Sequence, residues 1–236
     1  MSDRRHEIEI DIEASPSAVW EAISTAQGIM SWFAPEVRVA PGQGGSLFVS
    51  WGPGMEGSER ITAWEPDRHL QLTHERGGGA SASVVDYFIQ FVDGATSLRL
   101  IHSGFGDAAS FDEEFESTGG AWPVFMKMLK NSAERGGAAC RNVSLFRTFD
   151  CARADAWATL QRGIQHELQG VARHFDSMGY ACWEFPSRNH AMLAAFCETC
   201  SGKTMLTVTW LLYDATAEEV EEVRAHWNKL LDRVYA

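Results

Sequence analysis

The pattern that most constrains this chain is a series of short alternating segments in its first half, closed by one helical stripe. Residues 6–13 alternate strictly, with Ile8, Ile10 and Ile12 on one side and acidic residues on the other, which is typical of a half-buried β-strand. Further strands are predicted at residues 45–51, 57–65, 69–75, 83–92 and 97–103. Consecutive strands without intervening helices favour an antiparallel sheet.

Turn residues separate these strands, and a helix is predicted directly after the first one. The breaks are Pro53–Gly54, Pro66–Asp67, Gly77–Gly79 and Asp93–Gly94, all of residue types that favour turns. Asp93–Gly94 lies between two alternating segments and indicates a tight hairpin. Ser15–Pro16 predicts a helix start, because serine caps helices and proline fits their first turn.

A helical stripe follows the last of these strands. Its apolar residues recur mostly at spacings of three and four and are Phe111, Phe115, Trp122, Phe125, Met126, Leu129 and Ala133. Gly119–Gly120 and Pro123 interrupt the stripe, and both residue types disfavour a helix interior. We therefore expect a short helix, a kink, and a main helix over residues 120–134.

The second half of the chain predicts a separate, smaller domain. Gly136–Gly137 indicates a linker, so we expect domains at residues 1–136 and 141–236. We predict strands at residues 143–149, 181–185, 191–198 and 204–213. A last helix is predicted to begin after Thr216, because the spacing from Thr216 to Glu219 fits a capping box. Between the first two strands we expect one long amphipathic helix, with an apolar face of Trp157, Leu160, Ile164, Leu168, Val171 and Phe175.

The two halves share a local pattern. Residues 13–20 and 150–157 both follow a predicted strand, open a predicted helix and end in tryptophan. The second domain is therefore either a reduced repeat of the first or an unrelated fold with a similar strand-to-helix junction.

Composition excludes several classes of partner. The 236 residues carry a net charge of −12, which argues against nucleic acids and anionic membranes because both bind basic surfaces. The apolar stretches are far shorter than the ~20 residues that span a bilayer. With no apolar signal segment after Met1, we expect a cytoplasmic protein. The sequence leaves the oligomeric state open, and a dimer is one of the options.

The five cysteines do not indicate a cofactor. All lie in the second half, and an odd number without a signal peptide favours reduced thiols. Cys197 and Cys200 resemble half of a zinc knuckle, but a second pair is missing, and Cys182 and His190 are the remaining candidates to complete a site. We therefore predict neither a metal site nor any other cofactor.

Four segments in order carry a family resemblance. They are the alternating isoleucines followed by residues 14–20, then residues 61–70, 98–105 and 120–130. Together they resemble the SRPBCC/START-like superfamily, and within it the bacterial group similar to the C-terminal domain of the activator of the 90-kDa heat-shock protein ATPase. The resemblance implies an α+β fold in which a curved antiparallel sheet holds a C-terminal helix, called a helix-grip, over residues 6–135.

The resemblance also implies a cavity between the sheet and its helix, without a metal, a nucleotide or a fixed catalytic set. Superfamily members bind lipids, hormones and polyketides, and some catalyse cyclisation. Strand parity and the helical stripe place most of the candidate ligand-binding residues toward this space, and the resemblance adds Trp32 and Phe33, where the family's first pair of helices ends. The full set is Trp32, Phe33, Leu72, His74, Tyr87, Ile89, Phe91, Leu100, His102, Trp122, Phe125, Met126 and Leu129.

His74 and His102 allow two interpretations. On the apolar side of their strands they would meet inside the cavity and orient a polar group or act as acid and base. Alternatively, they are two separately satisfied histidines near strand ends. No serine or cysteine lies in a recognisable nucleophile motif, so no catalytic residue is assigned and enzymatic activity stays open.

Three functional hypotheses follow. The first is a non-catalytic protein that binds a small, largely apolar ligand in the cavity. The second is a protein-interaction module, such as a co-chaperone-like regulator of a heat-shock ATPase. The third is an enzyme acting on a hydrophobic substrate in the same cavity.

Overall fold

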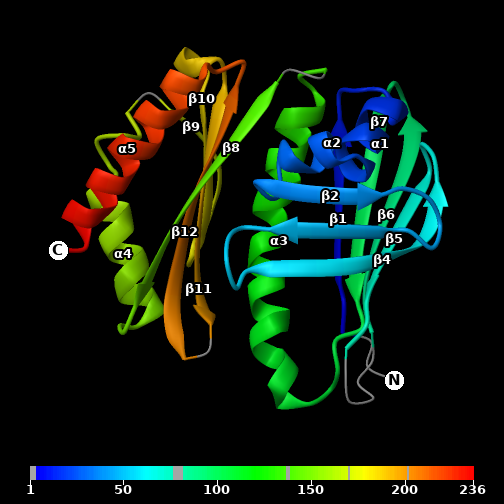
Figure 1. The fold of residues 1–236 in the computed structure, drawn as a ribbon, viewed down its shortest axis with the longest axis horizontal. Coiled ribbons are helices and arrows are strands. Elements are labelled where there is room, and N and C mark those ends of the chain that lie inside the picture. Colours follow the sequence, from blue (N-terminus) through cyan, green and yellow to red (C-terminus); the bar gives the residue numbers. More distant parts are fainter. Residues whose placement is uncertain (1–3, 77–81, 137–138, 170, 201) are drawn as a thin grey trace. The chain divides into compact units, whose positions relative to one another are not determined.

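The alternating segments of the first half form one antiparallel sheet of seven strands (Figure 1). The computed structural model describes residues 4–76, 82–136, 139–169, 171–200 and 202–236, in two units at residues 1–138 and 139–236. The predicted turn at Gly77–Gly79 and Gly137 of the predicted linker lie outside the described residues. The strands are β1 (His6–Ile12), β2 (Glu36–Ala40), β3 (Ser46–Ser50), β4 (Glu56–Glu65), β5 (His69–His74), β6 (Ser83–Val92) and β7 (Ala95–Ser103), in the order β1-β7-β6-β5-β4-β3-β2.

The strand β2 was absent from the sequence-based prediction. Its burial alternates, with Val37 buried between the exposed Glu36 and Arg38. The period-2 signal was therefore present, but it covers only five residues at the end of the sheet.

Three helices accompany this sheet. α1 (Pro16–Ser24) is capped by the side chain of Ser15, as predicted, and α2 (Ala26–Met30) follows it. A short 3-10 turn (Ala109–Phe111) precedes α3 (Asp112–Ala133). In Figure 1, β2 and β4 cross α3, whereas β1, β6 and β7 run roughly along it. This is the helix-grip arrangement, and the predicted α+β class is confirmed.

The predicted break in the last helix of this unit was wrong. α3 is one helix of 22 residues that continues through Gly119, Gly120 and Pro123. A Cβ at position 119 would lie 2.7 Å from the His6 ring, so glycine lets β1 approach the helix. Burial of Trp122 and Met126 in this unit stabilises the helix despite its unfavourable residues, because packing outweighs propensity.

The second unit repeats the connectivity of the first with fewer strands. Its five-stranded antiparallel sheet has the order β8-β12-β11-β10-β9, so in both units the first strand pairs with the last. In both, a helical segment follows the first strand and a helix follows the last strand. The elements are β8 (Cys140–Phe149), α4 (Arg153–Gly163), β9 (Ala172–Ser177), β10 (Tyr180–Phe185), a 3-10 turn (Pro186–Arg188), β11 (Ala191–Cys200), β12 (Lys203–Tyr213) and α5 (Ala217–Val234).

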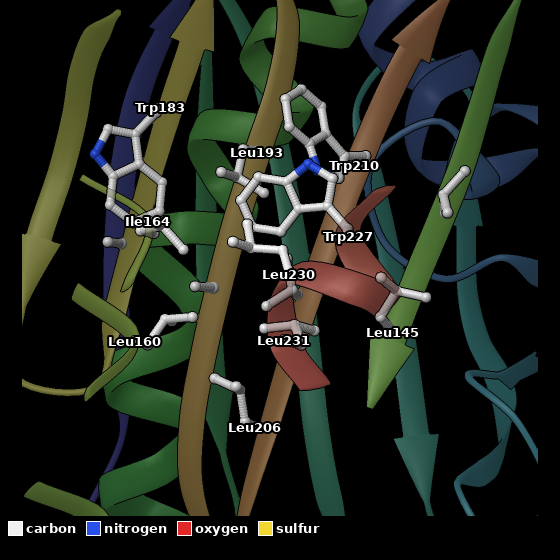
Figure 2. Close-up of a cluster of buried hydrophobic side chains, with 14 of the residues drawn as sticks. Leu145, Leu160, Ile164, Trp183, Leu193, Leu206, Trp210, Trp227, Leu230 and Leu231 are labelled. Carbon is white, nitrogen blue, oxygen red and sulfur yellow. The ribbon is translucent and has the colours of Figure 1, made fainter. Parts of the chain in front are cut away.

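The core of the second unit lies between its sheet and the helices α4 and α5. Figure 2 shows Trp210 of β12 beside Trp227 of α5, with ring centroids 5.5 Å apart. Leu160 of α4 and Leu231 of α5 are fully buried in the same cluster. The predicted capping box at the start of α5 is confirmed, since Thr216 and Glu219 exchange both hydrogen bonds.

The predicted long helix in this unit was wrong in its second half. α4 ends at Gly163, and Phe175 belongs to the strand β9 instead. A Cβ at Gly163 would lie 2.3 Å from the Val234 side chain, so the glycine allows α5 to approach. Apolar residues beyond it continued a helical spacing by coincidence, in a turn and an edge strand.

Candidate functional site

The first unit contains a cavity of about 260 Å³ on the face of the sheet that holds the helices. Strands β3 to β7 form one wall, and the helical segments form the other. The lining residues are Ile23, Ile29, Trp32, Phe33, Leu47, Val49, Glu59, Leu72, His74, Ser83, Val85, Tyr87, His102, Glu114, Thr118 and Trp122. Most of them are apolar or aromatic, as in typical small-molecule sites.

Three aromatic side chains form much of the apolar wall. The indole nitrogen of Trp32 donates to the Ala22 carbonyl at 2.9 Å, which fixes this ring at the end of α2. Phe33 lies parallel to Trp122, with ring centroids 6.1 Å apart. These rings offer flat, rigid surfaces on which an aromatic or aliphatic frame can pack.

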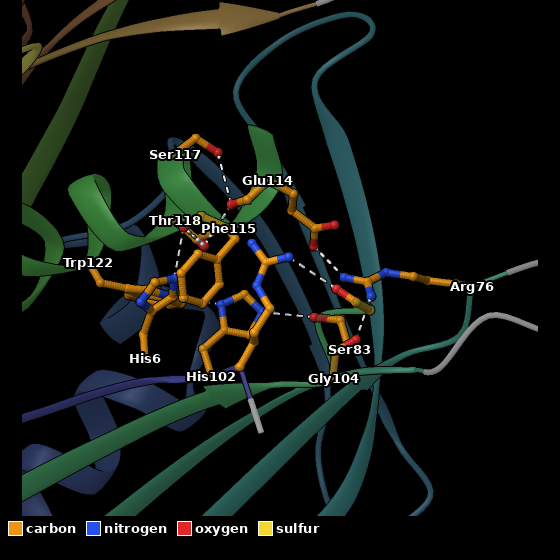
Figure 3. Close-up of polar contacts among 12 residues, drawn as sticks. His6, Arg76, Ser83, His102, Gly104, Glu114, Phe115, Ser117, Thr118 and Trp122 are labelled. Carbon is orange, nitrogen blue, oxygen red and sulfur yellow. Dashed lines mark hydrogen bonds and ion pairs between the residues drawn. The ribbon is translucent and has the colours of Figure 1, made fainter. Parts of the chain in front are cut away.

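His102 is held between Trp122 and Ser83 (Figure 3). The indole nitrogen of Trp122 donates to Nδ1 of His102 at 3.0 Å. Because an indole N–H can only donate, Nδ1 carries no proton, so Nε2 carries it and donates to Oγ of Ser83 at 2.8 Å. Burial lowers the pKa of His102 to about 3, with smaller contributions from His6 and Arg76.

This arrangement limits the chemistry of His102. Its ring is neutral near pH 7 and both nitrogens are engaged, so it has no free lone pair with which to accept a proton. Ser83 accepts a hydrogen bond from His102 and is not activated by it. The three residues therefore form a fixed polar element in the cavity wall.

A row of polar residues crosses the sheet at this end of the cavity. His74 of β5 pairs with Ser83 of β6, and the pairing of Arg60 with Thr73 places Glu59 of β4 beside His74 on the other side. Nδ1 of His74 donates to the Ser58 carbonyl at 3.1 Å, since a carbonyl can only accept.

The helix α3 contributes the remaining polar groups at this end. Arg76 donates to the Gly104 carbonyl at 2.7 Å and pairs with the carboxylate of Glu114 (Figure 3). Thr118 donates to the Glu114 carbonyl at 2.8 Å. Glu114 and Thr118 are thus held by Arg76 and by the backbone of α3.

The structure places the predicted ligand-binding residues in three settings. Seven of them line the cavity, namely Trp32, Phe33, Leu72, His74, Tyr87, His102 and Trp122. Four others are buried core residues outside the cavity lining, namely Ile89, Leu100, Met126 and Leu129. Phe125 lies edge-on to Phe33, with ring centroids 4.7 Å apart.

Phe91 was placed wrongly. It has the inward parity of Tyr87 and Ile89 but is 63% exposed. The hairpin tip around Asp93–Gly94 extends past the buried part of the sheet, so parity alone does not bury Phe91.

Sequence reasoning missed nine lining residues. Strand parity could have identified Leu47, Val49 and Val85, which are apolar and point inward from their strands. Glu59 and Ser83 have the same inward parity, but their polar side chains suggest exposure. The others are Ile23, Ile29, Glu114 and Thr118, which come from the helical segments.

The cysteine pair of β11 does not form a metal half-site. Cys197 and Cys200 lie three residues apart in an extended strand, which separates them by about 10 Å and turns them to opposite faces. Burial raises the pKa of Cys197 to about 11. Among the described residues, no group of His, Cys, Asp or Glu side chains is arranged to hold a metal ion.

The second unit has a larger pocket, of about 430 Å³. Its lining includes the aromatic residues Phe185, Trp210 and Trp227 and the polar residues Glu222 and His226.

Within the described part of the chain, no helix has both the length and the hydropathy needed to cross a membrane.

Comparisons with known proteins relate the first unit to one family. Residues 13–134 match the family described as Activator of Hsp90 ATPase homolog 1-like protein. No curated protein matches the chain.

Two solved structures show the fold of the first unit. The Aha1 dimer from Colwellia psychrerythraea is 22% identical, covers 56% of this chain and 97% of its own, and superposes with a TM-score of 0.50. Protein MLL2253 from Mesorhizobium loti is 23% identical, with 57% and 99% covered and a TM-score of 0.51. DynU16, from the dynemicin biosynthetic locus, is also similar, at 17% identity, with 98% and 97% covered and a TM-score of 0.49.

The family match spans more than half of the chain and includes strands β2 to β7, the three helices and the cavity of the first unit. The chain therefore belongs to the Activator of Hsp90 ATPase homolog 1-like family, within the SRPBCC superfamily that its sequence resembles.

Proposed function

We propose that the first unit binds a small, largely apolar molecule in the cavity between its sheet and its helices. The observation that carries this proposal is the cavity itself, about 260 Å³ with mainly apolar walls. Protein interiors are normally close-packed, so a space of this size with mainly apolar walls is unusual inside a small domain. Such a space is therefore expected to be occupied by water or by a ligand.

The size and the walls indicate the kind of molecule. The cavity is slightly smaller than typical drug-sized sites of about 300–1,000 Å³, which favours a compact ligand. Trp32, Phe33 and Trp122 favour a flat frame. A naphthalene ring carrying one polar substituent is a suitable probe.

Thermal unfolding and calorimetric titration with 2-naphthalenemethanol test the proposal. At a free concentration ten times Kd, binding adds about 1.4 kcal/mol, which raises Tm by about 4–6 °C. Val85→Trp fills the cavity and is expected to abolish the shift. Val84→Trp changes the neighbouring residue of the same strand, which faces the opposite side of the sheet, and serves as the matched control.

The proposal fails if Val85→Trp binds the probe as tightly as the parent protein does. It also fails if no compact apolar compound, neutral or charged, shifts Tm of the parent.

A second candidate function is interaction with a protein partner, as the family description suggests. Phe91 and Val92 support it, since both are at least half exposed at the tip of the β6–β7 hairpin. If this tip binds a heat-shock ATPase, the double substitution Phe91→Ser and Val92→Ser reduces stimulation of the ATPase without changing Tm. Absence of any stimulation by the parent protein would reject this candidate.

The hypothesis of an enzyme has less support. His102 is neutral and both of its ring nitrogens are hydrogen-bonded, and Ser83 is not activated.

A further inference from the structure

Several polar groups at the end of the cavity already have partners. Both nitrogens of His102 are engaged, Glu114 is paired with Arg76, and Thr118 donates to the backbone of α3. None of these groups requires a ligand to satisfy its hydrogen bonds.

Three other groups on the cavity wall have unused hydrogen-bonding capacity. Among the described residues, the carboxyl group of Glu59, Nε2 of His74 and the hydroxyl of Tyr87 have no hydrogen-bond partner. Tyr87 is only 4% exposed, and Glu59 is half-buried. None of these atoms is among the fully buried polar atoms without a partner in the described residues, so all three are open to a group that enters the cavity.

All three of these groups can accept a hydrogen bond. A carboxylate and Nε2 of a histidine that donates through Nδ1 are acceptors, and a phenol oxygen accepts as well as donates. The complementary ligand group is therefore rich in donors. A primary ammonium group has three N–H donors and one positive charge.

The charges around the cavity also favour a positively charged ligand group. Burial raises the pKa of Glu59, an effect that His74 partly opposes, and burial together with the nearby Glu59 raises the pKa of Tyr87. The Glu59 carboxyl group is thus poorly solvated, and a bound cation would stabilise its ionised form. Residues 1–138 contain 20 acidic and 10 basic side chains, so the unit attracts cations and repels anions.

We infer that the cavity selects compact aromatic or aliphatic amines, with the ammonium group bound to Glu59, His74 and Tyr87 and the apolar frame packed against Trp32, Phe33 and Trp122. This inference rests on the proposed binding function and adds the chemical class of the ligand.

Calorimetric titration of the whole protein at pH 7.5 with three compounds of one frame tests it. The compounds are 2-naphthylmethylamine, 2-naphthalenemethanol and 2-naphthoate, which differ in charge and in donor content. The amine is expected to bind at least ten times more tightly than the alcohol, and the carboxylate is expected to bind most weakly.

Variants of Glu59 separate the contribution of its charge. Glu59→Gln is expected to bring the amine within threefold of the alcohol while the affinity for the alcohol is retained, and Glu59→Asp is expected to keep a preference for the amine. Glu56→Gln, on the same strand with an exposed side chain, is the matched control and should leave all three affinities unchanged.

The pH dependence gives a readout that needs no variant. Because the ammonium group favours ionised Glu59, affinity for the amine should rise as pH increases from 5 to 7.5, and affinity for the alcohol should not. Equal binding of amine and alcohol by the parent protein, or tighter binding of the carboxylate, would overturn the inference and leave the proposed function standing. If none of the three compounds binds, the inference fails, and the proposed function fails with it when no other compact apolar compound shifts Tm.

Discussion

The substitution His102→Gln should remove a large part of the acid sensitivity of the first unit. His102 is 6% exposed and neutral in the folded protein, where its pKa is lowered to about 3 from 6.5, mainly by burial. The unfolded chain therefore binds a proton that the folded chain excludes between these two values. The stability that His102 contributes is complete above pH 6.5 and is lost as the pH falls toward 3.

The magnitude follows from the difference between the two pKa values. At pH 5.5, one unit below the unfolded value, the loss is about 1.4 kcal/mol, and at pH 4.5 it reaches about 2.7 kcal/mol. Glutamine does not titrate, yet its amide can accept from Trp122 and donate to Ser83. His102→Gln should therefore lower stability at neutral pH only modestly and remove this acid-dependent loss.

Urea unfolding of the parent and the variant at pH 7.5 and 5.5 measures the effect. The parent should lose about 1.4 kcal/mol more than His102→Gln between these values, because contributions from all other groups cancel in the comparison. Val84→Ala on the neighbouring strand is the control, since it removes no titratable group and should leave the parent's pH dependence intact. If the parent and His102→Gln lose equal stability, the assignment of a buried, neutral His102 is refuted.

Three further predictions concern packing, capping and thiol reactivity. Gly119→Ala places a Cβ 2.7 Å from the His6 ring and should lower the free energy of unfolding in urea by about 1–3 kcal/mol. Gly57→Ala is the control, because its nearest contact would be at 3.6 Å, and it should cost less than half as much. Equal losses for the two variants would contradict the close approach of β1 to α3. Thr216→Ala removes the capping box of α5 and should cost about 0.5–2 kcal/mol, and an unchanged urea midpoint would show that the cap contributes nothing. Cys197 is buried and its pKa is raised to about 11, so iodoacetamide at pH 8 should alkylate it well after the exposed cysteines. Peptide mass spectrometry can follow the modification of each cysteine, and simultaneous modification would argue against the burial of Cys197.

Local patterns were sufficient for most elements of this chain. The alternation of Ile8, Ile10 and Ile12 identified β1, and the spacing of Thr216 and Glu219 identified the capped start of α5. These signals are local because strand parity and capping depend on residues within a few positions of one another. The order of such elements along the chain, together with their residues, was also sufficient to identify the superfamily.

Long-range packing decided what these patterns left open. Gly119 lies inside a continuous α3 because β1 approaches it there, and no local rule contains that contact. Phe91 and Ile89 share one parity, yet only Ile89 is buried, since the cover of the sheet ends between them.

The polar end of the cavity shows the same division most clearly. Strand parity turned Tyr87 toward the buried side of the sheet, and the sequence by itself determined that much. Glu59 has the parity of the buried Ile61, but its polar side chain suggested exposure. Only the tertiary structure places Trp122 of α3 against His102 of β7, which fixes the histidine tautomer. It also shows that, within the described residues, the carboxyl group of Glu59 and the hydroxyl of Tyr87 have no hydrogen-bond partner. Which polar groups are satisfied depends on contacts between elements that lie far apart in the chain, and a local pattern cannot encode those contacts.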